Sequence, residues 1–327
     1  MTTSILCVGQ LVADIVVRPV KGLPVPGRTD FVEELELLAG GCAANTAAVL
    51  AKLGAEARLA ALIGQDSLGD AALADLKTAG VRFDTVLREP AVSTAAVIVV
   101  VSDTGERSFL YRGGGNEQLA NRHVPDAALQ AACIVHVGGA MKLMNLDLAE
   151  LMERAKSFGC TTSLDTDWDP RGNWMRRLER ALTNVDYLMT NQEEAAMLSG
   201  KEAPGDAARA LLARGPQAVV VKRGEHGALL ATRAETTEFP AYRVEVRDTT
   251  CAGDAFVAGF LLGISRGWPL EASMRLGNAA GGLCTTQISH RGITSLEDTR
   301  RLINGQFCER RLAGSPPGLA EDGCRKD

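Results

Sequence analysis

The feature of this sequence that most restricts its fold is a regular alternation of short apolar runs and helix-forming stretches. The apolar runs predict buried strands at 5–9, 58–64, 133–137, 161–165, 187–190 and 218–222. Helical patterns are found at 46–53, 66–80, 146–157, about 172–183, from 191, and at 270–285 and 296–311. Strands that alternate with helices are typical of a parallel sheet, because each helix returns the chain to the same sheet edge. We therefore predict an α/β fold with a mostly parallel sheet sandwiched between helices.

One extended segment interrupts this alternation. Residues 93–101 are strongly β-forming, 103–106 supply turn residues, and 107–112 continue extended, which predicts a hairpin. Residues 15–38 are rich in proline and also predict extended and looped chain rather than helix. The two segments together predict a small sheet that lies away from the main one.

Composition excludes several classes of protein. The 327 residues carry a formal net charge of -5, so no basic patch predicts a nucleic-acid partner. No apolar run reaches the roughly 18 residues of a membrane span, and no basic region leads into a signal peptide, so we expect a cytoplasmic protein without a membrane partner. None of the 8 cysteines has metal-knuckle spacing, and we expect neither a structural metal nor disulfides. The Pro- and Gly-containing, charged segment 313–327 predicts a disordered tail.

The strongest candidate site is the turn from Asp248 to Asp254, Asp-Thr-Thr-Cys-Ala-Gly-Asp. The alternating residues 243–248 predict a strand before it, and the apolar run after Asp254 predicts a helix. Small residues leave backbone N–H groups uncovered, and the helix start adds unpaired donors, so the turn suits an anion. Asp254 either caps the helix or is a base beside that anion; a second carboxylate at Asp248 and the small Gly253 favour the base.

Three further sets of residues carry weaker signals, each with a structural alternative. Asp14 follows the first strand and could bind hydroxyl groups, or be a solvated loop acid. Two glycines and Asn45 open a helix, and present donors or serve helix packing only. Asn191 and Glu194 share the first turn of another helix, which also fits a capping box. Neither G-x-x-x-x-G-K-[ST] nor G-x-G-x-x-G between strand and helix is present, so 248–254 is the remaining candidate phosphate site.

Together these motifs resemble the ribokinase-like (PfkB-type) carbohydrate kinases over about residues 4–312. Gly40-Gly-x-x-x-Asn45 is similar to the family's N-terminal signature, and Asp248-Thr-x-x-Ala-Gly-Asp254 to its more specific C-terminal signature. Asn191-x-x-Glu194 resembles the magnesium and phosphate motif, and Lys222-Arg-Gly224 with Gly227 resembles a nucleotide-contacting turn. The resemblance implies a single ribokinase-like domain at 1–312 with a small β lid from about 12–38 and 93–112. It also implies a homodimer, because the lid often forms a dimer clasp in this family.

The resemblance implies an ATP-dependent sugar kinase that needs magnesium and phosphorylates a primary hydroxyl, and it assigns a role to each matching residue. Asp254 would be the base, and the backbone of Cys251, Ala252 and Gly253 the anion hole. Asp14, Gly41 and Asn45 would hold the sugar. Glu194 would act on magnesium through water, with Asn191 near the phosphates, and Lys222, Gly224, Gly227 and Asn278 would line the nucleotide site. Asp248 and Thr250 match positions that bind a monovalent cation, such as potassium, in some members.

Three features depart from the family pattern or extend it. Cys251 stands where the family often has Gly or Ala, and a thiol at a helix N-terminus should have a lowered pKa, so we expect sensitivity to alkylation. Arg171 lies in a stretch similar to one in fructokinase and ketodeoxygluconate kinase relatives. It either binds an acidic or ketose substrate or forms a surface ion pair. Ala43 and Ala44 stand where ribokinase-type members tend to have a glycine, which weakens the expectation that ribose itself is the substrate.

Two rival functions remain from the sequence. A nucleoside kinase on the same scaffold would prefer adenosine or a similar ribonucleoside. A non-catalytic regulator that binds sugar or nucleotide could keep the fold, although such a protein has no need of a base at Asp254. Which sugar is used and whether potassium activates do not follow from the sequence.

Overall fold

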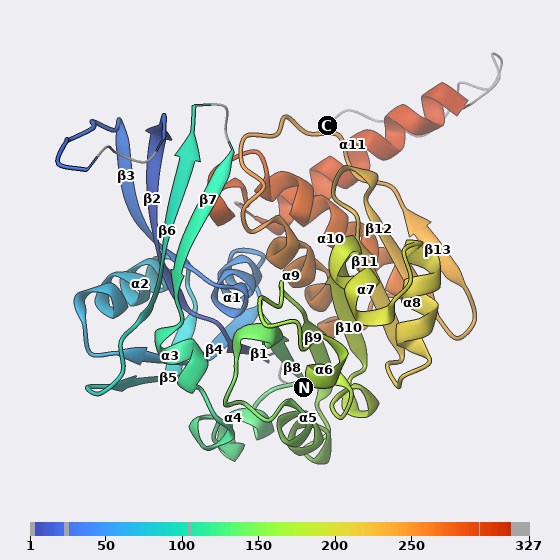
Figure 1. The fold of residues 1–327 in the computed structure, drawn as a ribbon. Helices are drawn as coiled ribbons and strands as arrows, with labels where there is room; N and C mark the ends of the chain where they lie inside the picture. Colours follow the sequence, from blue (N-terminus) through green and yellow to red (C-terminus); the bar gives the residue numbers. More distant parts are fainter. Residues whose placement is uncertain (1–3, 23–25, 104–105, 294, 315–327) are drawn as a thin grey trace.

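The computed structural model describes residues 4–22, 26–103, 106–293 and 295–314. Its main layer is a nine-stranded sheet with the order β13-β12-β11-β10-β9-β8-β1-β4-β5 (Figure 1). The strands are β1 (Ser4–Gly9), β4 (Glu56–Gly64), β5 (Arg82–Glu89), β8 (Ile134–Gly138), β9 (Thr161–Asp165), β10 (Tyr187–Asn191), β11 (Ala218–Lys222), β12 (Ala228–Thr232) and β13 (Thr236–Phe239). From β5 to β11 the pairs are all parallel, and β12 and β13 add antiparallel pairs at one edge.

Helices cover both faces of this sheet, because its central strands are apolar on both sides. In β1, Ile5 and Cys7 join one core, while Leu6 and Val8 join the other. The first core packs against α1 (Cys42–Lys52), α2 (Ser67–Thr78), α9 (Ala252–Ser265), α10 (Leu270–Cys284) and α11 (Leu296–Gly314). The second packs against α4 (Asp126–Gln130), α5 (Leu148–Ser157), α6 (Met175–Leu178), α7 (Gln192–Ser199) and α8 (Pro204–Leu212). The predicted α/β architecture is confirmed, and no described helix is both long and apolar enough to cross a membrane.

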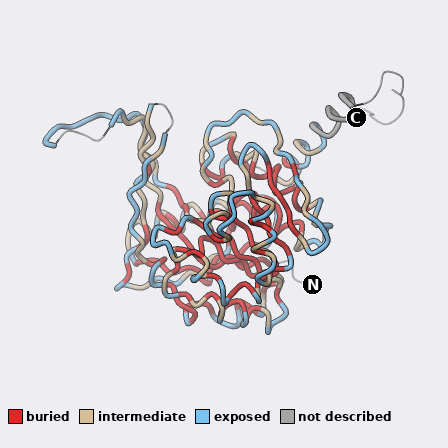
Figure 2. The backbone as a smooth tube through the Cα atoms, turned by 45° about the vertical axis from the view of Figure 1, so that its right-hand side comes forward, coloured by how far each residue is buried: buried red, intermediate tan, exposed pale blue. Residues whose placement is uncertain are grey.

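A separate four-stranded sheet projects from this body, and we call it the lid sheet (Figures 1 and 2). Its order is β3 (Glu34–Gly40), β2 (Val12–Val20), β6 (Ala95–Ser102) and β7 (Arg107–Arg112), so the predicted hairpin is present as β6 and β7. Asp14 pairs with Val97, which pairs with Tyr111, so these side chains share one face. We call this the inner face. Arg107 also lies on it, because it is four residues from Tyr111 on the same strand and side chains alternate along a strand. The outer face carries Leu35, Leu37, Ile98 and Leu110.

The strand predicted at 243–248 is wrong. These residues form no regular element, although the alternation of Val244 and Val246 suits a half-buried strand. The backbone N–H groups of Arg247 and Asp248 both donate to the carbonyl of Thr285, so they are bound to the end of α10 rather than to a strand. Val244 lies near Gly282 of α10, and Val246 is 59% exposed.

Other sequence expectations differ mainly at element ends. The helix predicted to run to about 183 is limited to α6 and a short turn, because the Asp169 carboxylate binds the amides of Arg171 and Trp174 and holds a loop there. The strands β5, β12 and β13 and helix α8 were not expected from the sequence. The predicted tail at 313–327 overlaps α11, which reaches Gly314, and its remainder lies outside the described residues.

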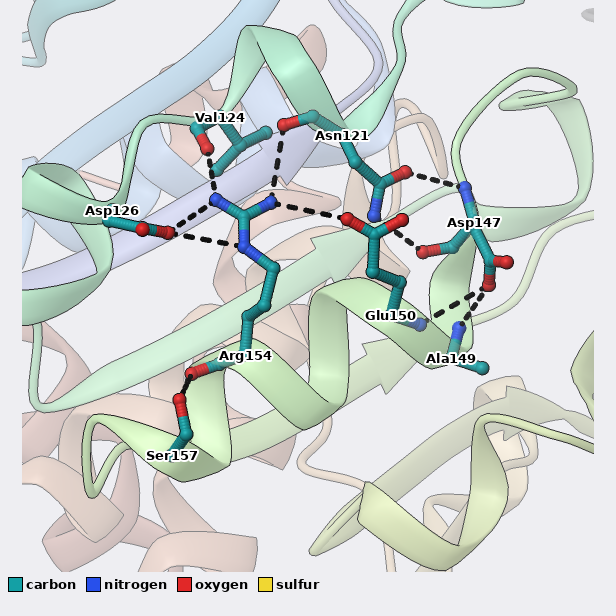
Figure 3. A network of polar contacts seen from close by, with 8 residues as sticks. All are labelled: Asn121, Val124, Asp126, Asp147, Ala149, Glu150, Arg154 and Ser157. Atoms are coloured by element: carbon teal, nitrogen blue, oxygen red, sulfur yellow. Dashed lines mark hydrogen bonds and ion pairs between the residues drawn. The ribbon is translucent and has the colours of Figure 1, made fainter.

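A polar network joins α5 to the segments that precede α4 and α5 (Figure 3). Arg154 of α5 donates to Asp126 Oδ1 at 2.6 Å and to the carbonyl of Val124 at 2.8 Å. Asn121 and Asp147 exchange two hydrogen bonds, of 2.9 and 2.7 Å, and Asp147 also caps α5. These contacts hold the connections around α4 and α5 in place by satisfying backbone groups that loops would otherwise leave unpaired.

The crossing of α9 and α10 depends on glycine. A Cβ at Gly259 would lie 2.7 Å from the carbonyl oxygen of Leu276, and one at Gly263 would lie 2.4 Å from Ser273 Oγ. Neither contact is tolerated without movement of the helices. Because α9 begins at the candidate site, this close packing also fixes where that site lies.

We predict that Gly259→Ala destabilises the protein by about 1–3 kcal/mol in urea unfolding, because overpacking outweighs the better helix propensity of alanine. Gly305→Ala in α11 is the matched control, because no atom lies within 4 Å of the added Cβ. It should be neutral or stabilising by up to about 1 kcal/mol. Equal effects of the two substitutions would contradict the packing argument.

Candidate active site

The candidate residues meet at one edge of the main sheet because parallel strands end there together. Gln10 follows β1, Asp165 ends β9, Asn191 ends β10 and Lys222 ends β11. The start of α9 adds Asp254 to this edge through its contact with Asn45 of α1. The inner face of the lid sheet adds Asp14, whose carboxylate the Asp254 charge reaches.

Asp254 is buried in the first turn of α9, and it does not cap that helix. Cys251 is the N-cap residue, while Asp254 Oδ2 accepts a hydrogen bond of 2.8 Å from Asn45 Nδ2. Burial raises the pKa of Asp254 to about 6, and the hydrogen bond from Asn45 and the charge of Lys222 oppose a larger rise. A carboxylate with this pKa is largely ionised at neutral pH and can still accept a proton.

The turn before α9 has the conformation of an anion-binding loop. Cys251 adopts a left-handed conformation with φ 67°, next to the right-handed residues of the helix. Such a change of hand turns successive amides to one side. Lys222 Nζ lies against this turn, 3.4 Å from where a Cβ at Gly253 would stand. The amide of Ala252 already donates a long hydrogen bond of 3.3 Å to the carbonyl of Thr249, so one donor of the predicted anion hole has a protein partner.

The expectation of a lowered pKa for Cys251 is wrong. The thiol is buried, and a hydrogen bond with Cys284, burial and the charge of Asp254 raise its pKa well above its ordinary value. The positive end of the helix is therefore outweighed by neighbours that disfavour a thiolate. The basis for expecting easy alkylation at Cys251 is lost.

The predicted sugar-binding residues lie together beside Asp254. Burial, and then the charge of Asp254, raise the pKa of Asp14 to about 7. Its carboxylate lies over Gly40, where a Cβ would stand 2.1 Å from Asp14 Oδ2, and Gly41 has φ 92°. Asn45 Oδ1 is buried and has no hydrogen-bond partner among the described residues. An unpaired buried acceptor is costly, and here it is available to a ligand hydroxyl.

Sequence reasoning missed two carboxylates at this edge. Asp165 accepts from Lys222 Nζ at 2.6 Å, and burial raises its pKa to about 7 despite that amine. Asp167 accepts from Gln10 Nε2 at 2.8 Å and from Lys142 Nζ at 2.7 Å. Both lie at or just after the end of a predicted strand, so the rule applied to Asp14 would have found them.

Asn191 and Glu194 form the capping box that was the structural alternative. The Asn191 side chain accepts from the Glu194 amide at 2.8 Å, and Glu194 Oε2 accepts from the Asn191 amide at 3.1 Å. The same oxygen also accepts from Thr166 Oγ1 at 2.6 Å. Glu194 is thus held rigidly at the sheet edge, where its charge contributes to the raised pKa of Lys222.

The predicted nucleotide residues are divided between two places. Lys222 points toward Asp165 and the 251–254 turn, whereas Asn278 lines a separate pocket of about 720 Å³ bounded by β12, β13 and α10. Asn278 Nδ2 donates to the carbonyl of Phe239 at 3.0 Å, and a Cβ at Gly227 would lie 2.0 Å from that same oxygen. Gly224 adopts φ 56° in the turn that links the two places.

The predicted cation site and Arg171 both have partners within the protein. Arg107 of the lid sheet donates to Asp248 Oδ1 and, at 2.5 Å, to Thr250 Oγ1, so a guanidinium lies on the two residues predicted for a monovalent cation. Arg171 pairs with Glu117 at 2.9 Å, and both side chains are about half exposed. The structure therefore shows the surface ion pair that was the alternative for Arg171.

Comparison with known proteins adds a family. The sequence matches the pfkB family carbohydrate kinases over residues 2–296. A ribokinase of Staphylococcus aureus is 27% identical over 293 residues, covering 86% of this chain and 93% of that protein. An ATP-dependent ribose-1-phosphate kinase of Halopiger xanaduensis is 29% identical over 304 residues, covering 93% and 99%.

Solved structures agree over a similar length. The structure of Arabidopsis thaliana ribokinase complexed with ribose and ATP has a TM-score of 0.80 at 25% identity, covering 93% of this chain and 99% of that chain. A fructokinase from Xylella fastidiosa with bound ATP has a TM-score of 0.81 at 26% identity, covering 94% and 100%. The similarity thus extends over nearly the whole of each chain.

The raised pKa of Asp14 predicts a stability effect with a definite sign. A carboxyl whose pKa is higher in the folded protein stabilises the fold below its unfolded value near 3.8, and this stability is lost as pH rises through about 7. Asp14→Asn should therefore raise the melting temperature at pH 8 by about 2 °C or more, and the gain should vanish towards pH 4. Asp84→Asn is the control of opposite sign, because burial is outweighed by the combined hydrogen bonds and positive charges of Arg58 and its neighbours, which lower the pKa of Asp84. A pH-independent gain at Asp14 would contradict this account.

Proposed function

The chain belongs to the pfkB family of carbohydrate kinases, and we propose that it transfers the γ-phosphoryl group of ATP to a primary hydroxyl of a small sugar or sugar acid. The acceptor would be ribose-, fructose- or ketodeoxygluconate-like. The single observation that carries this proposal is Asp254, buried at the start of α9, bound by Asn45 and with a pKa of about 6. A carboxylate in that state beside an anion-binding turn suits removal of a proton from an attacking hydroxyl.

In the proposed reaction, Asp254 takes the proton of the acceptor hydroxyl as its oxygen attacks the γ-phosphorus, and the bond from that phosphorus to the β,γ-bridging oxygen breaks to release ADP. The amides at 251–253 and the amine of Lys222 would stabilise the charge on the transferred phosphoryl oxygens. Asp14 and the unpaired Asn45 Oδ1 would orient the acceptor by hydrogen bonds to its other hydroxyls. Positioning and charge stabilisation would then supply most of the rate, as is general for phosphoryl transfer.

The residues present suit a magnesium–nucleotide complex. Asp165, Asp167, Glu194 and Asp254 are buried, and the amines of Lys142 and Lys222 lie close to them. No group of three ligating side chains among the described residues forms a preassembled metal site, which fits an ion that arrives with nucleotide phosphates. Glu194 would hold magnesium through water, and Asn191 would lie near the phosphates. Magnesium would supply neutralisation of the phosphate charge.

The pocket beside Asn278 is the proposed place for the nucleotide base. Its volume of about 720 Å³ lies within the range of small-molecule sites. Gly224 and Gly227 connect this pocket to Lys222 by a turn with two left-handed residues, which leaves room for phosphates along the backbone. The similar ribokinase and fructokinase structures both hold ATP, which supports a nucleotide site in this chain as well.

We also propose that the lid sheets of two chains pack together in a homodimer. The outer face of the lid sheet exposes Leu35 by 66%, Leu110 by 63%, Leu37 by 40% and Ile98 by 39%. Apolar side chains gathered on one face of a projecting sheet are costly in water and typical of an interface. A second copy offers the same apolar face, as a two-fold dimer requires.

The proposed function predicts ATP turnover with one member of an acceptor panel of pentoses, hexoses, keto-deoxy acids and nucleosides in the presence of magnesium. kcat/KM should fall as pH decreases through about 6, because protonated Asp254 cannot accept a proton. Asp254→Asn should lower kcat by about 100-fold or more and leave ligand binding, measured by calorimetry, largely unchanged. Retained turnover in this variant would overturn the role of the base. Turnover of nucleosides alone would favour the nucleoside kinase, and ligand binding without turnover would favour a regulator.

The proposed dimer predicts a mass of twice 34.6 kDa in light scattering at micromolar concentration. Leu110→Glu should shift the protein to a monomer, because an ionised carboxylate would have to be buried in the interface. Met197→Glu replaces a 50% exposed apolar side chain of α7 and should leave the mass unchanged. A monomeric natural chain, or dissociation by both substitutions, would contradict an interface through the lid.

A further inference from the structure

Arg107 joins the lid sheet to the turn that precedes Asp254. It lies on β7, across from Val101 and on the same face as Tyr111, and its guanidinium reaches a segment 141 residues further along the chain. It donates to Thr250 Oγ1 and to Asp248 Oδ1, and the side chains of Arg107 and Asp248 are only 21% and 13% exposed. A largely buried, charge-assisted contact with two acceptors holds its geometry better than an exposed ion pair does.

The guanidinium also acts on the backbone of the turn. Asp248 Oδ1, which accepts from Arg107, accepts the Thr250 amide as well, at 2.7 Å. Thr250 directly precedes Cys251, whose left-handed conformation begins the anion-binding loop. Other contacts of this turn come from the body: Arg247 and Asp248 bind the carbonyl of Thr285, and Cys284 bonds to Cys251 and to the carbonyl of Thr250. Arg107 adds to these a contact from the lid sheet, on the two residues that lead the chain into α9.

The same sheet carries a residue of the candidate acceptor site. Asp14 lies on the inner face with Arg107, and both line a small pocket with Asp248 and Thr250. Tyr111, also on β7, accepts a hydrogen bond of 3.1 Å from Asn116 Nδ2 and lies under the amine of Lys142, so a second contact holds this strand to the body. A shift of the lid sheet would therefore move Asp14 and release the turn together.

We propose that Arg107 is a positioning residue that couples the placement of the lid sheet to the alignment of the anion-binding turn. The coupling rests on the proposed kinase reaction, because its expected effect is on phosphoryl transfer. Arg107 acts through Asp248 and Thr250 and contacts neither acceptor nor nucleotide in this scheme. Loss of the guanidinium should then slow the chemical step while both substrates bind almost normally.

The test compares Arg107→Gln with Arg82→Gln, a control that removes a strand arginine outside the lid sheet, one whose exposed ion pair with Glu56 joins β5 to β4. Arg107→Gln should lower kcat by about 10- to 100-fold, with KM for ATP and acceptor changed by less than about 3-fold. Arg82→Gln should change neither constant. Arg107→Lys, which keeps the charge but cannot bridge both oxygens in the same way, should fall between the natural chain and Arg107→Gln. Guanidinium chloride below its denaturing concentration should partly restore Arg107→Gln, whereas potassium chloride of equal ionic strength should not.

Hydrogen exchange without substrates supplies a second measurement. The amides of residues 249–253 should exchange faster in Arg107→Gln than in the natural chain or in Arg82→Gln. Unchanged kcat, or a rise in KM alone, would overturn the positioning role, and unchanged exchange would overturn the contact's hold on the turn. If the natural chain transfers no phosphoryl group to any acceptor, the proposed function fails, and the exchange measurement alone decides whether Arg107 orders the turn.

Discussion

The arrangement of this molecule depends on carboxylates gathered at low exposure on one edge of a sheet. Burial raises the pKa of Asp14 and Asp165 to about 7 and of Asp254 to about 6, and neighbouring carboxylates add to each rise. Lys142 and Lys222 offset part of this charge and are themselves held by Asp167 and Asp165. The site therefore keeps an unfavourable excess of negative charge that a magnesium–nucleotide complex and a proton-donating acceptor would relieve. Burying these carboxylates lowers the stability of the fold, and the same burial raises the pKa of the base toward neutrality.

The parallel sheet is what makes that gathering possible. Its strands deliver their last residues to a common edge, and helices packed on both faces prevent those residues from spreading apart. Two close backbone approaches refine the placement. Gly40 leaves space for the Asp14 carboxylate, and the glycines of α9 bring that helix against α10. The lid sheet projects from the body, and Arg107 connects it to the turn before Asp254.

Much of the fold followed from the sequence because periodic apolar runs report buried strands and helices directly. The alternation failed at 243–248, where the segment alternates like a strand but is bonded to Thr285 at the end of α10 and forms no strand. The site was predicted in part. Asp254, Asn45 and Asp14 could be named from local motifs, whereas the contacts of Arg107 and Asp167 join segments far apart in the chain, and no local pattern encodes them. Cys251 shows the same limit, because Cys284 and Asp254, not the helix end alone, decide the state of its thiol.

The hydrogen bond between Asn45 and Asp254 spans 209 residues, and this separation has a consequence for how the protein is made. A chain growing from the ribosome has completed β1 through β13, and so the whole main sheet, before α9 exists. The sheet can therefore begin to fold during synthesis, while the carboxylate that completes the proposed active site is added among the last elements. Premature termination before residue 252 would release a sheet that lacks α9 and α10 on one face, exposing apolar core to solvent. Such a fragment would be inactive and prone to aggregate, so the resistance of this protein to aggregation and its activity both depend on the same final helices.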